Sequence, residues 1–161
     1  MNPTLALLAR HAGIWEGRYT HLDARDWSVQ EELRFRIRVE CPAPDGTAYR
    51  QTSRYWTKDG HAEELVYEGR GRGDRVDFDT GRIRGECWKI DADAVYLTFA
   101  FTEDPRGRIA EMIQLSGDGR HRARTWHWFR DEALWRLTLV KETRVSPDPA
   151  EWSRFTEAPT T

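Results

Sequence analysis

The feature that most constrains the fold of this chain is an alternation of apolar and polar residues with a period of two. Residues 33–39 read leucine, arginine, phenylalanine, arginine, isoleucine, arginine, valine, and residues 95–101 repeat the spacing. Successive side chains of a β-strand point to opposite faces, so this pattern predicts strands with one buried face and one face in water. An amphipathic helix would need apolar residues three or four positions apart.

Short turn motifs separate the predicted strands. Turn-forming pairs or triplets occur at Asp45-Gly46, Asp59-Gly60, Thr80-Gly81, Pro105-Arg106-Gly107 and Asp118-Gly119. One strand plus its turn takes about 10–14 residues, which suits hairpins and leaves no room for crossover helices. We therefore predict an all-β fold, a single antiparallel up-and-down β-barrel of about ten strands whose interior has room for one small molecule.

The two ends of the chain carry helix signals. Asn2 and Pro3 predict a short helix over residues 3–11, which places the barrel domain at residues 1–145. Residues 146–161 are predicted to be a C-terminal tail. A capping motif at Asp148-Pro149 starts a possible short helix there, and residues 158–161 are expected to be disordered.

Composition excludes several classes of function. A net charge of −2 gives no field for nucleic acid or an anionic membrane, so neither partner is predicted. The first residues lack the basic and long apolar stretches of a signal peptide or membrane span, and we expect a cytoplasmic protein, with a homodimer as a possible assembly. The five histidines and two cysteines show no metal-binding spacing, so no metal site is predicted.

Counting residues across the predicted turns assigns one face of the strands to the interior. The counted pairs are Ile113 with Arg124, Leu115 with Arg122, Trp126 with Leu137, Trp128 with Trp135, Phe99 with Glu111, Leu97 with Ile113, and Phe78 with Ile83. A slip of one residue would instead turn inward the set Met112, Gln114, Thr125, His127, Phe129, Arg136 and Thr138.

Two ionisable residues, Glu111 and Arg124, share the predicted apolar face. One interpretation is a structural ion pair, because a buried charge is costly unless it is paired. The other is that Arg124 offers its planar fork of donors to a ligand carboxylate or carbonyl, with Glu111 orienting it and Trp126 and Trp128 as flat walls.

An earlier strand is unusually polar on its predicted inner face. If Arg50 and Arg54 point to water, the inner face of this strand carries Tyr49, Gln51, Ser53 and Tyr55. A few polar groups among aromatics such as Phe99 are typical of a small-molecule pocket. Phenols hydrogen-bonded to backbone at the barrel rim remain an equal alternative.

The segment Gly13-Ile14-Trp15 resembles the Gly-x-Trp signature of lipocalin-like (calycin) barrels. Residues 13–20, 111–115 and 122–129, in that order, are similar to a bacterial and cyanobacterial lipocalin-like family of unknown function. This resemblance implies a lipocalin-like barrel that binds something apolar or planar. It also implies that a basic residue of the last strand, here Arg144 or Arg136, packs across Trp15.

More distantly, the chain resembles the haem-binding nitrobindins and the bilin lyases of cyanobacteria. Nitrobindin-like proteins place a haem-ligating histidine near the end of the barrel, and the last strand here, residues 134–144, has none. No cofactor is therefore predicted, although haem or another tetrapyrrole held by His11 or His21 is an alternative.

These patterns favour intracellular binding of a small hydrophobic or aromatic molecule with a carboxylate or carbonyl. The predicted binding residues are Arg124, Trp126, Trp128, Glu111, Tyr49, Gln51, Tyr55 and Phe99. The alternative is a cofactor-independent isomerase, cyclase or hydratase in the same cavity, for which Glu111, Tyr55 or His127 are the candidate catalytic acid–base groups. A barrel filled by its own side chains, with no ligand, is the simplest alternative.

Overall fold

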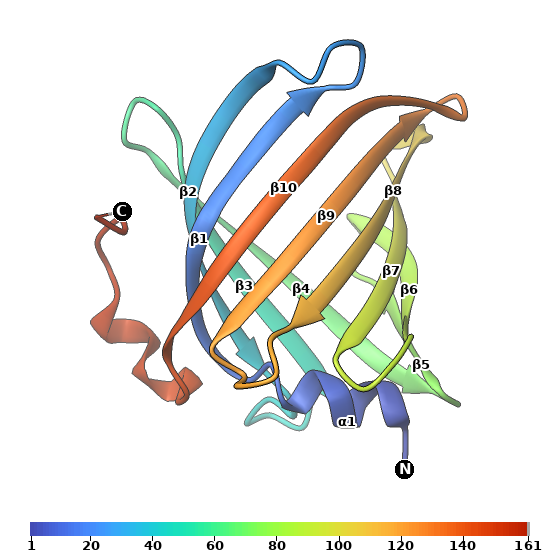
Figure 1. The fold of residues 1–161 in the computed structure, drawn as a ribbon. Coiled ribbons are helices and arrows are strands. Elements are labelled where there is room, and N and C mark those ends of the chain that lie inside the picture. Colours follow the sequence, from blue (N-terminus) through green and yellow to red (C-terminus); the bar gives the residue numbers. More distant parts are fainter. Residues whose placement is uncertain (161) are drawn as a thin grey trace.

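The computed structural model describes residues 1–160 and forms a closed antiparallel barrel (Figure 1). Its strands in the described residues are β1 (Gly13–Asp23), β2 (Val29–Glu40), β3 (Tyr49–Trp56), β4 (Ala62–Arg72), β5 (Arg75–Asp79), β6 (Ile83–Lys89), β7 (Ala94–Phe101), β8 (Asp104–Leu115), β9 (His121–Arg130) and β10 (Ala133–Ser146). Each strand pairs with its neighbours in sequence, and β1 pairs with β10 to close the barrel. The predicted up-and-down β-barrel is confirmed.

A short helix, α1 (Pro3–Ala9), lies across one end of the barrel (Figure 1). The side-chain oxygen of Asn2 accepts hydrogen bonds from the backbone N–H groups of Thr4 and Leu5 at 2.9 and 3.0 Å, as an N-cap does. Leu7 and Leu8 are buried against the barrel, so the helix closes this end. The helix ends at residue 9 rather than at the predicted residue 11.

The C-terminal segment packs on the outside of the barrel. Asp148 caps a short 3-10 helix, η1 (Pro149–Arg154), and Trp152 of this helix is buried, with the Arg54 guanidinium 4.7 Å from its ring centre. The predicted disorder of residues 158–160 is wrong, because Arg34 donates to the carbonyl oxygen of Pro159 at 2.6 Å. The last residue of that prediction, Thr161, lies outside the described residues.

Strand register confirms part of the predicted pairing. Ile113 lies opposite Arg124 and Leu115 opposite Arg122, as the Asp118-Gly119 turn predicts. Three other pairs are wrong by two residues, and the actual pairs are Phe99 with Ile109, Leu97 with Glu111, and Phe78 with Gly85. For the first two, the cause is that residues 105–107 belong to β8 and form no turn. A shift of two residues leaves each side chain on its predicted face.

The pairing of β9 with β10 is wrong by one residue. The actual pairs are Trp126 with Thr138 and Trp128 with Arg136. The register shifts between Leu134 and Arg136, where β10 carries a β-bulge. One extra residue in a strand exchanges the inward-facing and outward-facing side chains for the rest of that strand.

The side chains of β10 that point into the barrel are consequently those that the counted pairing turned outward. Thr138 and Glu142 are fully buried, Val140 is 5% exposed, and Leu139 is 41% exposed. The reversal brings a carboxylate, Glu142, into the barrel. It also moves Arg136 from the outer face to the mouth.

The closed end of the barrel is built around Trp15, which is fully buried. The guanidinium carbons of Arg122 and Arg144 each lie 4.6 Å from the centre of its ring system. Its indole N–H donates to the carbonyl oxygen of His11 at 2.8 Å. The predicted packing of a basic residue from the last strand is confirmed for Arg144, by a cation–π contact.

Among residues 1–160, no helix has the length and hydropathy needed to cross a bilayer.

Candidate functional site

The barrel encloses a cavity of about 290 Å³. Its lining runs from Leu8 of α1, at the closed end, to Glu31, Arg82 and Arg136 at the opposite end, which we call the mouth. This volume is at the lower end of the range of about 300–1,000 Å³ found for pockets that hold drug-sized ligands. The cavity therefore suits one small molecule.

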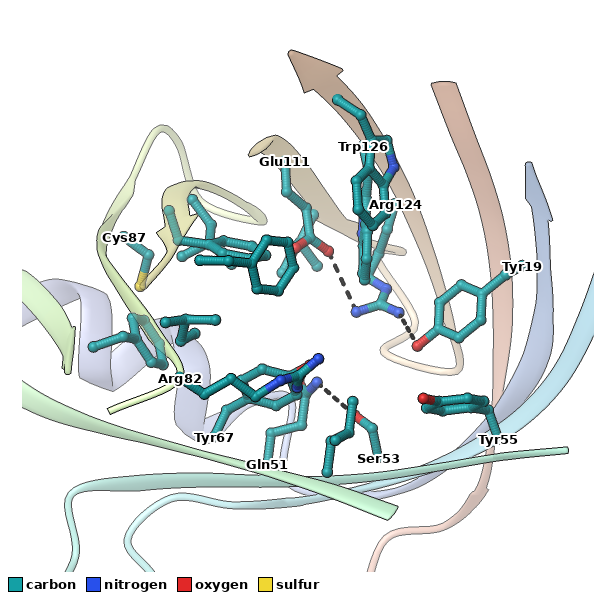
Figure 2. A pocket seen from close by; sticks show the side chains of 18 of the residues that line it. Tyr19, Gln51, Ser53, Tyr55, Tyr67, Arg82, Cys87, Glu111, Arg124 and Trp126 are labelled. Atoms are coloured by element: carbon teal, nitrogen blue, oxygen red, sulfur yellow. Dashed lines mark hydrogen bonds and ion pairs between the residues drawn. The ribbon is translucent and has the colours of Figure 1, made fainter. Parts of the chain in front are cut away.

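All of the predicted binding residues line this cavity, namely Arg124, Trp126, Trp128, Glu111, Tyr49, Gln51, Tyr55 and Phe99. Figure 2 labels five of them: Arg124, Trp126, Glu111, Gln51 and Tyr55. The predicted binding residues come from β3 and from the three consecutive strands β7, β8 and β9, which share one interior. Their role in binding stays a prediction.

Four charged side chains form a buried network at the floor of the cavity, which we call the floor cluster. Its members are Glu111, Arg122, Arg124 and Glu142, each at most 2% exposed. Arg122 donates to both carboxylate oxygens of Glu142. Arg124 Nε lies 3.4 Å from Glu142 Oε1, and Arg124 Nη1 lies 3.3 Å from Glu111 Oε1. The cluster pairs two guanidinium groups with two carboxylates.

Figure 2 shows the Arg124 guanidinium between Glu111 on one side and Tyr19 on the other. Arg124 Nη2 donates to the Tyr19 hydroxyl at 3.2 Å. Burial raises the pKa of Tyr19, so the hydroxyl stays protonated. Burial by itself would lower the pKa of Arg124, but the carboxylates of Glu142 and Glu111 reverse this and raise it. Arg124 is therefore a permanent cation whose partners are already in place.

Burial raises the pKa of Glu111, against the opposing effect of Arg124. Its Oε1 atom is sealed from solvent and has no hydrogen-bond partner among residues 1–160. A buried carboxyl with a raised pKa keeps its proton to a higher pH than an exposed carboxyl does. Glu111 is thus the side chain of the floor best suited to exchange a proton with a guest.

A row of polar groups follows β3 along the opposite wall. The Tyr49 hydroxyl donates to Gln51 Oε1 and Gln51 Nε2 donates to Ser53 Oγ, both at 3.0 Å. At the mouth, the Tyr55 hydroxyl donates to a carboxylate oxygen of Glu63. Burial and this hydrogen bond raise the pKa of Tyr55 to about 12. The polar groups of this wall are linked to side chains rather than to backbone.

Aromatic rings make the wall of β7 and β9. The rings of Trp126 and Trp128 lie 5.7 Å apart, and Phe101 stacks on Trp128 at 6.3 Å with an angle of 24° between the planes. The indole N–H of Trp126 has no hydrogen-bond partner within residues 1–160. Such a wall offers large flat surfaces to a planar molecule.

His21 is a cavity residue that the strand pattern did not single out as a binding residue. Thr138 Oγ1 accepts from the Trp128 indole N–H at 2.8 Å and lies 2.7 Å from His21 Nδ1. The Thr138 hydroxyl can accept from the indole and still exchange a hydrogen bond with the imidazole, so it links the two side chains. Burial and the charge of Arg136 lower the pKa of His21 to about 4, so the ring is neutral at pH 7.

The other histidines proposed from the sequence lie outside the cavity. His127 is exposed on the outer face of β9, so the alternative register that turned it inward is wrong, and its side chain cannot act on a guest inside the barrel. His11 is 1% exposed beneath the floor and does not line the cavity. Of the two histidines considered as tetrapyrrole ligands, His21 alone faces the interior.

Comparison with known proteins identifies the fold. No family model matches the chain, and a search of curated proteins finds no match. A protein of unknown function from the DUF3598 family of Nostoc punctiforme is similar in structure, with a TM-score of 0.64 and 18% identity. The match covers 86% of this chain and 49% of that one, so the chain spans about half the length of this neighbour.

Two further solved structures match over nearly their whole length. An S-type phycobiliprotein lyase, CPES from Guillardia theta, matches with a TM-score of 0.66 and 12% identity over 86% of this chain and 90% of the lyase. Rv2717c from M. tuberculosis matches with a TM-score of 0.59 and 15% identity over 88% of this chain and 97% of that protein. These likenesses support a lipocalin-like barrel fold.

Proposed function

We propose that this protein binds one small, mainly apolar and planar molecule inside the barrel. The observation that carries the proposal is the cavity of about 290 Å³, with aromatic rings on one side and a short row of polar groups on the other. A barrel that served only as a packed scaffold would fill this volume, because protein interiors are packed nearly as densely as organic crystals.

The energy of binding would come mainly from the aromatic wall. Covering apolar surface contributes about 25 cal/mol per Å², so burying about 200 Å² of a planar guest contributes about 5 kcal/mol before the cost of immobilising it. Trp126, Trp128 and Phe99 supply that surface. The Gln51 amide and Arg124 supply hydrogen-bond donors that fix the orientation of a carbonyl group.

One solved neighbour is in keeping with this proposal without carrying it. The lyase from Guillardia theta is named for its action on phycobiliproteins, and the Nostoc punctiforme protein has no stated function. At 12–18% identity, these neighbours support the fold.

The test is native mass spectrometry of the natively purified protein and of two tryptophan variants. Leu97 lines the cavity, while Thr98, the next residue of β7, faces outward between Glu86 and Ala110. We expect a bound small molecule in wild type and in Thr98→Trp, and its loss in Leu97→Trp, where the added indole occupies the cavity. Equal ligand occupancy in the two variants would contradict binding inside the barrel.

A second candidate function, cofactor-independent acid–base catalysis, is favoured by the raised pKa of Glu111 in the cavity. In that case Glu111 would transfer the proton and Arg124 would stabilise developing negative charge on the substrate. Conversion of a bound molecule that stops in Glu111→Gln, with binding retained, would support catalysis. A ligand released unchanged in mass by both proteins would refute it.

A further inference from the structure

The positive charges around the cavity are not all balanced in the same way. The lining contains three arginines and two glutamates: Arg82, Arg124, Arg136, Glu31 and Glu111. At the floor, Arg124 already faces two carboxylates. At the mouth, neither Arg82 nor Arg136 forms an ion pair with any of residues 1–160. The arginines of the lining that lack an ion-pair partner therefore lie at the mouth.

The two mouth arginines are joined by aromatic rings into a continuous arc, which we call the rim arc. Its members in spatial order are Arg82, Phe101, Trp128 and Arg136. The Arg82 guanidinium carbon lies 5.6 Å from the Phe101 ring centre, Phe101 stacks on Trp128, and the Arg136 guanidinium carbon lies 5.7 Å from the Trp128 ring centre. The cations flank the upper edge of the aromatic wall.

Each arginine is held by neutral partners. Arg82 Nη1 donates to the Tyr67 hydroxyl at 3.2 Å, and Arg136 Nε donates to Gln30 Oε1 at 3.0 Å. These hydrogen bonds orient the guanidinium groups and leave their charges uncompensated. In Figure 2 the Arg82 side chain extends to Tyr67 at the edge of the pocket.

His21 adds a neutral imidazole near Arg136. Its Nδ1 is engaged by Thr138, so Nε2 is the ring nitrogen that remains for a guest. Two carboxylates also lie at the mouth: Glu31 on β2, and Glu63 on β4, which accepts a hydrogen bond from the Tyr55 hydroxyl. With Glu31 included, the cavity lining still carries one more arginine than glutamates when Glu111 is ionised.

We propose that the rim arc binds the anionic group of an amphiphilic ligand, so that the ligand enters with its aromatic body first and keeps a carboxylate at the mouth. This inference rests on the proposed binding function and assigns its ligand class, an aromatic monocarboxylate. The floor then contacts the neutral end of the ligand. This orientation spares Arg124 from exchanging a carboxylate partner that it already has, which would leave Glu111 or Glu142 buried without compensation.

The test compares two probes that share a body and differ in charge, naphthoate and naphthamide. Binding is followed by quenching of the intrinsic tryptophan fluorescence, since Trp126 and Trp128 line the cavity. We expect wild type to bind the carboxylate about tenfold more tightly than the amide, the size expected of one hydrogen bond to a charged group. This preference should fall as salt rises, because the mouth is open to solvent.

Substitutions at the mouth locate the preference. Arg136→Met and Arg82→Met should each weaken naphthoate binding and leave naphthamide binding within twofold of wild type. Arg136→Lys keeps the charge and should keep part of the preference. The matched control is Arg84→Met, because the Arg84 side chain is 75% exposed and does not line the cavity. Thermal unfolding of each variant checks that the barrel is intact.

The outcomes separate this inference from the proposed function. Equal affinity for the two probes in wild type, or a preference that survives the Arg82→Met/Arg136→Met double substitution, would overturn the rim arc while leaving cavity binding in place. If neither probe binds the cavity, the proposed function is refuted and the rim arc with it.

Discussion

Replacing Arg124 with methionine changes the charge balance of the floor cluster in a way that depends on pH. Arg124 is 2% exposed and lies 3.3 Å from a Glu111 oxygen and 3.4 Å from a Glu142 oxygen. In the variant, Glu142 keeps its two hydrogen bonds from Arg122. Glu111 loses its one ion-pair partner in the described residues. Methionine matches the length of the arginine stem, so the volume stays filled.

The magnitude follows from the proton on Glu111. Burial already raises the pKa of this carboxyl, and Arg124 opposes that rise, so its removal raises the pKa further. In the unfolded chain the carboxyl titrates near its ordinary value of about 4.3. Between that value and the folded-state pKa, the folded protein holds a proton that the unfolded chain has released. The free energy of unfolding of Arg124→Met therefore falls by about 1.4 kcal/mol per pH unit as pH rises.

The sign of this pH dependence can be measured directly. At pH 5 the variant should lie within about 1.5 kcal/mol of wild type, because a carboxyl that has lost its cation can take up a proton instead of staying a buried, unpaired charge. As pH rises towards 7 the variant should lose stability relative to wild type, by about 1.4 kcal/mol for each pH unit by which the substitution raises the pKa of Glu111. Urea unfolding followed by tryptophan fluorescence at pH 5, 6 and 7 measures the difference between the variant and wild type at each pH.

The double variant Arg124→Met/Glu111→Gln is the control. It has no titratable carboxyl at this position, so the extra pH dependence should vanish. A single variant whose stability relative to wild type is the same at pH 5 and pH 7 would refute the reasoning. A double variant that keeps the slope would show that another group titrates.

The remaining predictions concern other parts of the barrel. Glu142→Gln should lower the free energy of unfolding at pH 7 by about 3–5 kcal/mol, because Arg122 and Arg124 lose this carboxylate and an arginine cannot release its proton. This loss should exceed the loss that Arg124→Met causes at pH 5. Urea unfolding measures both. Thr138→Val should cost about 1–3 kcal/mol, since it leaves the Trp128 indole N–H and His21 Nδ1 without their partner. Gly85→Ala should lower the melting temperature by several degrees, because a Cβ there would stand 2.2 Å from the Thr98 carbonyl oxygen.

Much of the barrel could be predicted because the strand pattern tolerates errors of two residues. Phe99 and Phe78 were paired with the wrong partners, yet both face the interior as predicted. The eight predicted binding residues line the cavity for the same reason. Alternation reports which face a side chain takes, and the face survives an even shift.

The predicted register of the last strand, β10, was wrong because the strand contains one extra residue near Trp135. A β-bulge has no fixed composition, and both faces of β10 contain apolar residues, so neither register stood out. Charge offered a signal. Arg122 faces Leu115 across β8 and so points inward, and two buried arginines require more than the one carboxylate of Glu111. Glu142, opposite Arg122 on β10, meets that requirement.

His21 could not be found from the pattern, because its role depends on two residues far away in sequence. Thr138 and Trp128 place it, and both act through side chains on other strands. The C-terminal segment was difficult for a similar reason. Its order depends on Arg34 and Arg36 of β2, which donate to carbonyl oxygens of Pro159 and Glu157.

The most direct test of a guest inside the barrel is a crystal structure of the protein with naphthoate. We predict electron density for one naphthalene ring between the aromatic wall of Trp126 and Trp128 and the polar row of β3, with the carboxylate at the mouth. Density for the ring on the outer surface alone, with the cavity closed by its own side chains, would contradict the account.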